Sequence, residues 1–406
     1  MANVVTIAEH RIAAVDGRPF FPLAARHMPV GGDYRALEEA GFNAVRWTPF
    51  GVDQLEARDI EPPADLGGLL FYAYVYNRGD LAIDVESRRS ELTRLIQSVR
   101  EHPNLLAYEQ RNEPAGKYRD PATPQSTAEG MLAGSRVIRD LDPHHPICVG
   151  YSCGNLASTL RRYNPAVDVV GCNPYVVMPP GIRQFVGLRS DGKYVDSADQ
   201  TLSSVGLHTD KMMRVAERRA VWMQVQGASN ENWYNADHTP ESRNLGRYEY
   251  LRDNPNRWQM RFMAWQAVIR GATGLTWMLY GLPVDSRGWN EVSSVVREMR
   301  QLHDVLASPP WPGHLEVEYA ELGFSDWSGV QSLVKLHHGR PYIFAANSQF
   351  DPMIATFSNL PEGVGEELDV IGESRRVQVA SGSFTDRFQP YEVHIYQPCA
   401  HREMAR

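Results

Sequence analysis

A unit that recurs between about residue 23 and residue 306 constrains the fold more than any other feature of the sequence. Each unit is a helix with apolar periodicity, then Gly or Asn, then a short apolar strand that ends in polar or aromatic residues. In YRALEEAGFNAVRW, Leu37 and Ala40 mark one helix face, Gly41 ends the helix, and a buried strand spans 43–47. This alternation is typical of βαβ units, so it predicts an α/β fold with a parallel sheet.

Eight strands of this kind are present, which is the number that closes a (β/α)8 TIM barrel. They are predicted at 23–27, 43–47, 70–76, 105–111, 147–151, 167–172, 221–225 and 275–279. Ahead of them, residues 11–23 predict a hairpin, because Asp16-Gly17 suits the positive φ angles of a tight turn. Helices are predicted at about 87–100, 127–141, 210–218, 257–269 and 290–306.

The helical pattern stops at the proline-rich segment SPPWPG, residues 308–313. Short alternating strands follow at 315–319, 331–336, 342–347, 353–357, 376–379 and 393–396, which predict a small all-β sandwich. The length of 406 residues fits a barrel of about 250–320 residues and one companion domain. We therefore expect a catalytic barrel over 1–308 and a C-terminal β-sandwich over 314–398.

Composition narrows the class of ligand and partner. The formal net charge of −8 argues against a nucleic-acid binder, which would concentrate Lys and Arg on one face, and favours an uncharged or weakly charged small ligand. No run of eighteen apolar residues is present, and Glu9, His10 and Arg11 occupy the place of a signal peptide's apolar segment, so we expect a cytoplasmic location without a membrane partner. The four cysteines and the histidines form no metal-binding pattern, so we predict no metal and no other cofactor; a homo-oligomer is left open.

The candidate site lies where the fourth predicted strand ends. Reacting groups of TIM-barrel enzymes lie at the carboxyl ends of the strands. In HPNLLAYEQRNEPAG the strand is followed by Asn112-Glu113-Pro114, which brings a carboxylate and an amide to the mouth of the barrel. A purely structural role, in which Glu113 caps a loop or pairs with Arg111 or Lys117, is the alternative.

The Asn-Glu-Pro strand end, with its His-Pro-x-Leu lead-in, resembles the acid/base strand of the retaining glycoside hydrolases of clan A. The segments AGFNAVRW, DPHHP, VDVVGCNPY and IRGATGLTWMLYG are similar in the same order, so the resemblance covers residues 11–306. It implies that Glu113 protonates a glycosidic oxygen while Asn112 binds the sugar 2-hydroxyl. It also implies that Tyr175 hydrogen-bonds the carboxylate opposite the acid.

The seventh strand departs from that family, because RRAVWMQVQGASNENW has no carboxylate where the nucleophile is expected. Gln226 occupies the nearest matching position, and Trp222, Gln224 and Gln226 share one face by strand parity. An amide cannot form a glycosyl-enzyme ester. Three alternatives follow. A carboxylate from the loop after this strand holds a water, so that the reaction inverts the anomeric centre; another residue or the substrate supplies the second catalytic group; or the barrel binds sugar without cleaving it. The loop candidates are Glu231, Asp237 and Glu241; the others are Asp33, Asp285, Glu249 and the substrate itself.

Side chains at or just beyond the strand ends are suited to binding a sugar, because aromatic faces stack on pyranose C–H surfaces. The predicted substrate-binding aromatics are Tyr76, Tyr175, Trp222, Trp233 and Trp277, and the resemblance suggests His27 and Arg46 as polar contacts, with a structural role for His27 weighed equally. We thus predict a glycosidase that acts in an exo manner on a small β-linked glycoside. A non-catalytic sugar-binding barrel is the alternative function.

Overall fold

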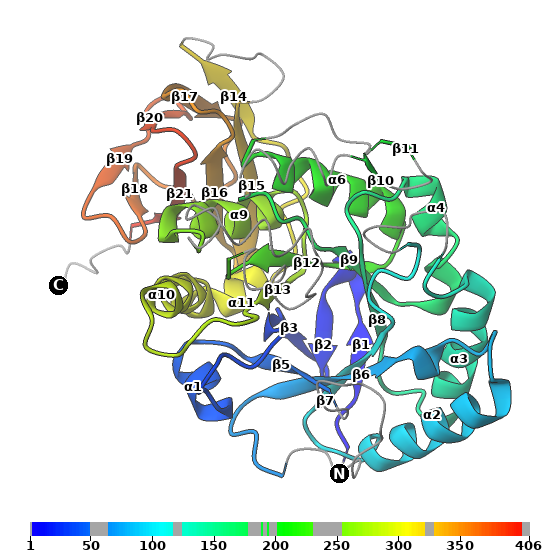
Figure 1. Cartoon of the computed structure of the whole chain (residues 1–406). Helices are drawn as coiled ribbons and strands as arrows, with labels where there is room; N and C mark the ends of the chain where they lie inside the picture. Colours follow the sequence, from blue (N-terminus) through cyan, green and yellow to red (C-terminus); the bar gives the residue numbers. More distant parts are fainter. Residues whose placement is uncertain are drawn as a thin grey trace, which may run out of the picture.

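A closed barrel of eight parallel strands forms the centre of the protein (Figure 1). The computed structural model describes residues 2–48, 64–116, 124–177, 188–189, 193–194, 201–229, 254–320 and 329–399. In ring order the barrel strands are β4 (Leu23–Ala25), β5 (Ala44–Trp47), β6 (Leu70–Tyr76), β7 (Leu105–Gln110), β8 (Ile147–Tyr151), β9 (Val169–Cys172), β12 (Ala220–Gln226) and β13 (Gly274–Met278). The predicted TIM barrel is confirmed, and no strand limit differs from its prediction by more than two residues.

Helices surround the barrel, and three of the longer ones, α3, α9 and α10, begin at residues whose side chains cap them. The α-helices are α1 (Tyr34–Glu39), α2 (Val85–Val99), α3 (Ala128–Leu141), α4 (Ala157–Arg161), α6 (Ser204–Ala216), α9 (Arg257–Ile269), α10 (Arg287–Gln301) and α11 (His303–Leu306). Thr127, Asn256 and Ser286 each accept a backbone N–H at the start of α3, α9 and α10. None of the helices in the described part of the chain is long and apolar enough to cross a membrane.

The described part of the barrel region also contains three short 3-10 helices and one additional pair of strands. The 3-10 helices are η1 (Glu9–Arg11), η2 (Asn77–Gly79) and η3 (Asn164–Ala166), and the pair is β10 (Leu188–Arg189) with β11 (Lys193–Tyr194). Helix α6 begins six residues before its predicted start at 210, because small and polar residues form its first turn and hide its apolar period.

The N-terminal segment closes the barrel at the amino ends of the strands. Strands β1 (Val5–Ile7), β2 (Ala13–Val15) and β3 (Arg18–Phe20) form one antiparallel sheet, and the predicted turn has φ of 49° at Asp16 and 76° at Gly17. Val5 packs in one buried cluster with residues of the barrel interior, and its N–H donates to the carbonyl of His144 over 2.9 Å. Ligands must therefore approach from the carboxyl ends of the strands.

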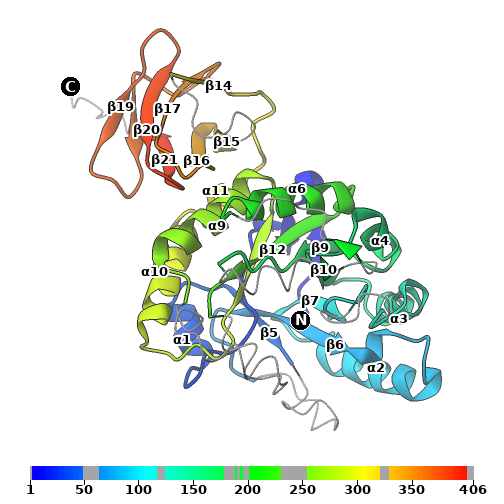
Figure 2. The ribbon, with the colours of Figure 1, turned by 45° about the horizontal axis from the view of Figure 1, so that its top comes forward.

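The C-terminal part is all-β and consists of two sheets (Figure 2). One sheet has the order β14 (Glu316–Tyr319), β17 (Met353–Ser358), β20 (Phe384–Phe388); the other has β15 (Val330–His337), β16 (Arg340–Asn347), β21 (Val393–Pro398), β18 (Glu367–Val370), β19 (Arg376–Gln378). An all-β C-terminal domain is thus confirmed. Strands β18 and β20 were missed because each is short and rich in charged residues.

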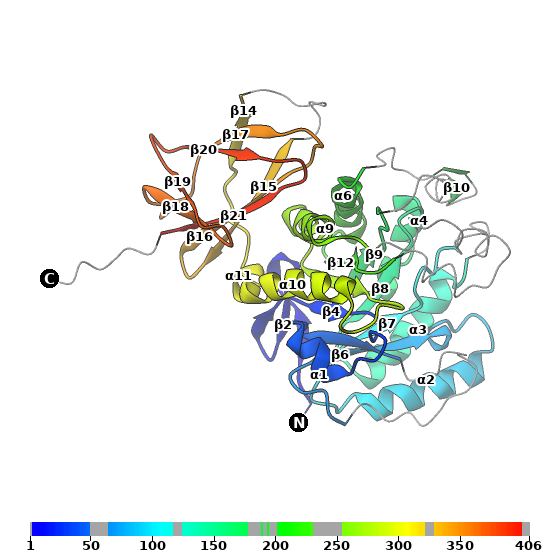
Figure 3. The same cartoon turned by 60° about the vertical axis from the view of Figure 1, so that its left-hand side comes forward.

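Helix α9 lies between the barrel and the all-β region (Figure 3). The rings of Trp265 on α9 and Phe344 on β16 stack with their centroids 5.3 Å apart, and both side chains are fully buried. Arg261 donates to the carbonyl of Val393 over 2.7 Å and pairs with Glu298 on α10. Because one buried apolar cluster extends from the barrel to β16 and β21, the two regions share a core.

A buried lysine joins the end of α11 to the second sheet. The Nζ atom of Lys335 on β15 donates to the carbonyls of Leu306 and Ser308 at 2.5 and 2.8 Å. Burial lowers the pKa of Lys335 to about 8. The amine therefore satisfies helix-end carbonyls that would otherwise have no partner inside the protein.

We predict that Phe344→Ala lowers the free energy of unfolding by about 3–5 kcal/mol, since it removes a buried ring and leaves a cavity against Trp265. Ile354→Ala is the control: this side chain of the same region is 44% exposed, so the cost should stay below about 1 kcal/mol. Urea denaturation followed by fluorescence measures both. Equal costs for the two variants would contradict a shared core.

We also predict a pH-dependent contribution of Lys335 to stability. Between pH 8 and 10.5 the unfolded chain keeps a proton on this amine that the folded protein has lost, so folding becomes more favourable as the pH rises. Relative to Lys335→Met, the wild type should gain on the order of 2–3 kcal/mol across this window. Urea midpoints of both proteins at several pH values measure the difference, and parallel curves would show that the amine titrates normally.

Candidate active site

Glu113 and Asn112 lie directly beyond β7, at the mouth of the barrel. Glu113 has a positive φ of 52°, and its N–H donates to the carbonyl of Gly150 beyond the middle of β8 over 2.7 Å. A non-glycine residue in this region of φ is uncommon and costs energy, so the contact with β8 fixes an unusual backbone conformation. Both side chains are half-buried.

Asn173, the residue after β9, connects the pair. Its Nδ2 atom donates to Oε1 of Glu113 and to Oδ1 of Asn112, both over 3.2 Å. Its Oδ1 atom accepts from Arg26, the residue after β4, over 3.2 Å. The predicted acid is therefore linked through one amide to the far side of the barrel mouth.

A buried carboxylate lies beneath these residues, between two arginines. Glu109 on β7 contacts Nη2 of Arg26 through Oε1 at 3.1 Å and Nε of Arg46 through Oε2 at 2.7 Å. All three side chains are at most 9% exposed. Burial lowers the pKa of Arg26, but Glu109 more than compensates, so that this pKa is raised overall and the guanidinium stays charged.

The two strand-seven glutamines have different surroundings. Gln224 accepts from Nη1 of Arg26 at 2.6 Å through Oε1 and donates from Nε2 to the hydroxyl of Tyr175 at 2.6 Å. Gln226 instead accepts from the backbone N–H of Val177 at 3.0 Å and donates to its carbonyl at 3.1 Å. Gln224 is thus the amide that meets Tyr175, while Gln226 fastens the segment after β9.

Burial raises the pKa of Tyr175 to about 12, so its hydroxyl remains protonated at neutral pH. A glycine makes room for this network. A Cβ atom on Gly150 would lie 2.9 Å from Oδ1 of Asn112 and 3.2 Å from Nη1 of Arg26. Any larger residue in the middle of β8 would push these side chains apart.

His27 and Arg46 lie at the strand ends, as predicted. The His27 ring meets Tyr280 edge-on with centroids 5.5 Å apart. Burial, together with the positive charges of Arg46 and Arg26, lowers the pKa of His27 well below 6.5, so the ring is neutral. The guanidinium carbon of Arg46 lies 3.5 Å from the centre of the Tyr74 ring, and the Tyr74 hydroxyl accepts from the N–H of Asn112 over 3.5 Å.

Tyr76 and Arg111 form part of the rim. The guanidinium carbon of Arg111 lies 4.4 Å from the centre of the Tyr76 ring, and Arg111 donates from Nε to Gln125 over 3.1 Å. Arg111 therefore has other partners than Glu113, which argues against the alternative that Glu113 serves only to pair with Arg111. Lys117, its other suggested partner, lies outside the described residues.

The tryptophans that the sequence predicts at the site differ in placement. Trp222 lies inside the barrel, where it lines a cavity of about 30 Å³ with Cys148 and Thr276. For Trp277 the prediction is wrong: the ring is fully buried in the layer between barrel and helices, edge-on to Phe42. The reason is strand parity, because Thr276 faces the barrel interior and its neighbour must face out.

Several predicted site residues lie outside the described part of the chain or away from the barrel mouth. Glu231, Trp233, Asp237, Glu241 and Glu249 lie outside the described residues. Asp33 caps the start of α1 by accepting from the N–H of Ala36, and Asp285 is exposed beyond β13. Within the described ranges, no group of three or more His, Cys, Asp or Glu residues is arranged to hold a metal ion.

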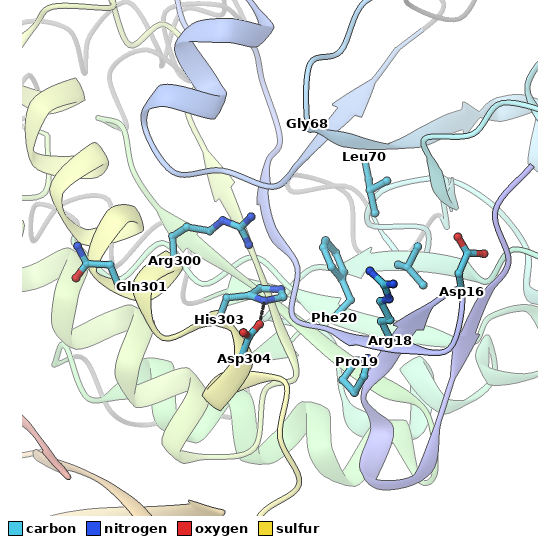
Figure 4. Close-up of a pocket in the computed structure, with 11 residues that line it drawn as sticks. Asp16, Arg18, Pro19, Phe20, Gly68, Leu70, Arg300, Gln301, His303 and Asp304 are labelled. Carbon is cyan, nitrogen blue, oxygen red and sulfur yellow. Dashed lines mark hydrogen bonds and ion pairs between the residues drawn. The ribbon is translucent and has the colours of Figure 1, made fainter. Parts of the chain in front are cut away.

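A second hollow, of about 990 Å³, lies at the opposite end of the barrel (Figure 4). Its walls come from the β2–β3 hairpin, the start of β6, the end of α10 and the start of α11. His303 lies in it, but Nδ1 of this ring contacts Asp304 at 2.9 Å and Nε2 accepts from the N–H of Phe21 at 3.2 Å. With both ring nitrogens engaged, His303 is not available as a general base.

The sequence signals for Glu109, Arg26 and Asn173 were present but not recognised. In LLAYEQ a carboxylate interrupts an apolar strand, and a buried charge implies a partner. Arg26 follows the first strand and Asn173 the sixth, which are the positions where site residues are expected.

No protein-family model matches the sequence, and no curated protein matches it. The fold is similar to that of a glycoside hydrolase family 5 protein from Bacteroides vulgatus, at 14% identity and a TM-score of 0.58 over 97% of this chain and 92% of that one. A β-galactosidase from Bacillus circulans sp. alkalophilus is 10% identical, with a TM-score of 0.55 over 93% and 99%. An α-amylase from Anoxybacillus is 9% identical, with a TM-score of 0.54 over 93% and 98%. These likenesses extend over the barrel and the all-β region, and at such identities they show the fold alone.

Proposed function

We propose that the protein is a glycosidase in which Glu113 is the general acid/base. The observation that carries the proposal is the position of Glu113 and Asn112 beyond β7, joined by Asn173 and half-open to the barrel mouth. General acid catalysis requires a carboxyl group within hydrogen-bond reach of the leaving oxygen, and the barrel mouth is where such groups act in this fold. Glycoside hydrolases among the proteins of similar fold support the reaction class.

Asn112 is proposed to bind the sugar 2-hydroxyl beside the bond that breaks. Its Oδ1 atom already accepts from Asn173, which leaves the Nδ2 group to donate to a hydroxyl oxygen. Hydrogen bonds to this hydroxyl strengthen as the oxocarbenium-like transition state forms. Arg46, His27, Tyr76 and Tyr175 are proposed to complete the wall of the sugar site.

The second catalytic group is proposed to be a carboxylate that activates water. Glu109, the buried carboxylate beneath the mouth, is engaged by both arginines, and Gln224 has no basic oxygen of comparable strength. We propose Glu231, which follows β12 in the sequence, as this base, which gives inversion at the anomeric carbon. Gln226 is proposed to support the site rather than to react, because both ends of its amide bind the Val177 backbone.

One observation favours a second candidate function, a barrel that binds sugar without cleaving it. Gln224 accepts from Arg26 and donates to Tyr175, so an amide fills the place that the clan A resemblance assigns to the partner of this tyrosine. A site that has lost its nucleophile keeps its affinity for sugar while turnover falls.

For the substrate, we propose exo-type action on a small β-linked glycoside. Arg26 contacts both Glu109 and Gln224, and these contacts close the bottom of the site. An oligosaccharide that enters from the barrel mouth is therefore proposed to place its terminal sugar there. The fold alone does not fix the linkage, because an α-amylase has a similar fold. The proposal of a β-linkage rests on the resemblance of the fourth strand to clan A. Product profiles on short oligosaccharides test both points, and release of mid-chain fragments from a polymer would count against exo action.

We predict that Glu113→Gln slows hydrolysis of glycosides with poor leaving groups by about 10²–10⁴-fold, the usual contribution of a general acid. Initial rates with a methyl and a dinitrophenyl glycoside of the same sugar measure the effect. The dinitrophenolate ion leaves without protonation, so its release should fall far less. This second substrate is the control that separates a lost acid from a damaged site.

A fully folded Glu113→Gln protein that hydrolyses the methyl glycoside at the wild-type rate would remove the catalytic assignment. No turnover of any glycoside by the wild type, together with sugar binding in calorimetry, would favour the sugar-binding barrel.

We further predict that the first product of the wild type has the anomeric configuration opposite to that of the substrate. Proton NMR during the first turnovers reads this configuration directly.

Gln224→Glu should change the outcome from inversion to retention, because Arg26 and the Tyr175 hydroxyl are already placed to hold a carboxylate at this position. Glu231→Ala should abolish the inverting reaction. Retention by the wild type would overturn the proposed water-activating base.

A further inference from the structure

Among the residues that the structure describes, the charges buried beneath Glu113 do not balance. Two guanidinium groups, those of Arg26 and Arg46, contact a single carboxylate, that of Glu109. The other partners of Arg26 at this level are the amides of Asn173 and Gln224, which carry no charge. Since a buried charge without a counter-ion is costly, an additional anion would stabilise this cluster.

Arg46 is the guanidinium with unused capacity. It contacts Glu109 through Nε, and its side chain is 9% exposed. Its buried Nη2 atom makes no hydrogen bond to any residue that the structure describes. Nδ1 of His27 is likewise buried without a partner in these ranges, and the lowered pKa of this ring means that it adds no charge.

Arg46 is connected to the proposed sugar site through Tyr74. Its guanidinium stacks on Tyr74, and the hydroxyl of Tyr74 accepts from the backbone N–H of Asn112, the neighbour of Glu113. A group bound to Arg46 is therefore separated from the proposed acid by one aromatic ring. One sugar could therefore contact both residues, with its glycosidic bond at Glu113 and a substituent of the same ring at Arg46.

Position 224 is a place in the described part of the cluster from which a side chain could supply this anion. Tyr175 and Arg26 contact this side chain at 2.6 Å each, and a carboxylate here would neutralise the surplus charge. The chain has an amide instead. Among the described residues no second carboxylate contacts the two guanidinium groups, so an anionic ligand would neutralise the described cluster on binding.

We propose that the site takes a glycoside whose sugar carries a carboxylate, a uronide, and that Arg46 binds this carboxylate. The proposal names the substrate class of the proposed glycosidase and rests on that function. It differs from the neutral ligand expected from the overall charge of −8, because net charge describes the whole surface and not one buried cluster. Guanidinium–carboxylate contacts are favoured in such sites because they are charge-assisted and directional.

The test is a matched pair of ligands that differ only at carbon 6. Calorimetry compares methyl β-D-glucuronide with methyl β-D-glucoside, and methyl β-D-galacturonide with methyl β-D-galactoside, on the Glu113→Gln protein so that nothing is hydrolysed. At least one uronide should bind about 10-fold or more tightly than its neutral partner, the effect of one charge-assisted hydrogen bond. Failure of both uronides to exceed their partners would overturn the proposal.

Two substitutions, each added to the Glu113→Gln background, locate the effect. Arg46→Gln should abolish the preference for the uronide, and Gln224→Glu should do the same by adding the missing negative charge while leaving Arg46 in place. The second variant decides the question if the first does not fold. Arg35→Gln, which removes an exposed arginine that pairs with Glu39 on α1, is the matched control and should keep the full preference.

A preference that survives in both Arg46→Gln and Gln224→Glu would overturn the assignment to this cluster. The outcome is separable from that of the proposed function, because binding and turnover are measured independently. Tight uronide binding by a wild type that cleaves nothing would remove the glycosidase and keep the uronide site. Cleavage of neutral glycosides without a preference for uronides would keep the glycosidase and remove the uronide site.

Discussion

The pairing of Glu109 with Arg26 and Arg46 is the contact on which the barrel mouth depends. It joins the ends of three strands, β4, β5 and β7, at a depth where water cannot replace a lost partner. Arg26 then extends the connection to the sixth and seventh strands through two amide oxygens. Removing the carboxylate would leave two buried cations facing each other, which is costlier than losing a single hydrogen bond. The geometry of the sugar site is thus set before any ligand arrives.

The architecture could be predicted from the sequence because helix and strand periods differ and alternate in a regular order. All eight barrel strands contain at least three apolar residues with at most one interruption between them, and their limits follow from turns and caps. The Asn-Glu pair was found for the same reason, since it directly follows a strand. Nothing in the sequence order brings Arg26 to Glu109, which lies 83 residues away, because that contact depends on how the ring closes.

The details that failed are those that depend on side-chain direction. Gln224 and Gln226 point the same way, yet one meets Tyr175 and the other the Val177 backbone, because they lie at different heights in the barrel. Trp277 was placed on the wrong face by a single position. A one-residue error in a strand reverses the side chain, whereas the same error leaves the fold class unchanged.

The shared core around α9 has a consequence for how the chain is made. The apolar side of this helix is covered by Phe344, and Arg261 on the helix binds the carbonyl of Val393, which lies 132 residues further along the chain. These partners are therefore synthesised well after the helix itself. At the ribosome the eighth strand and its neighbouring helices emerge long before that cover exists. A nearly complete barrel must therefore wait with an exposed apolar helix, and we infer that the nascent protein passes through a period in which it depends on chaperones or on rapid elongation.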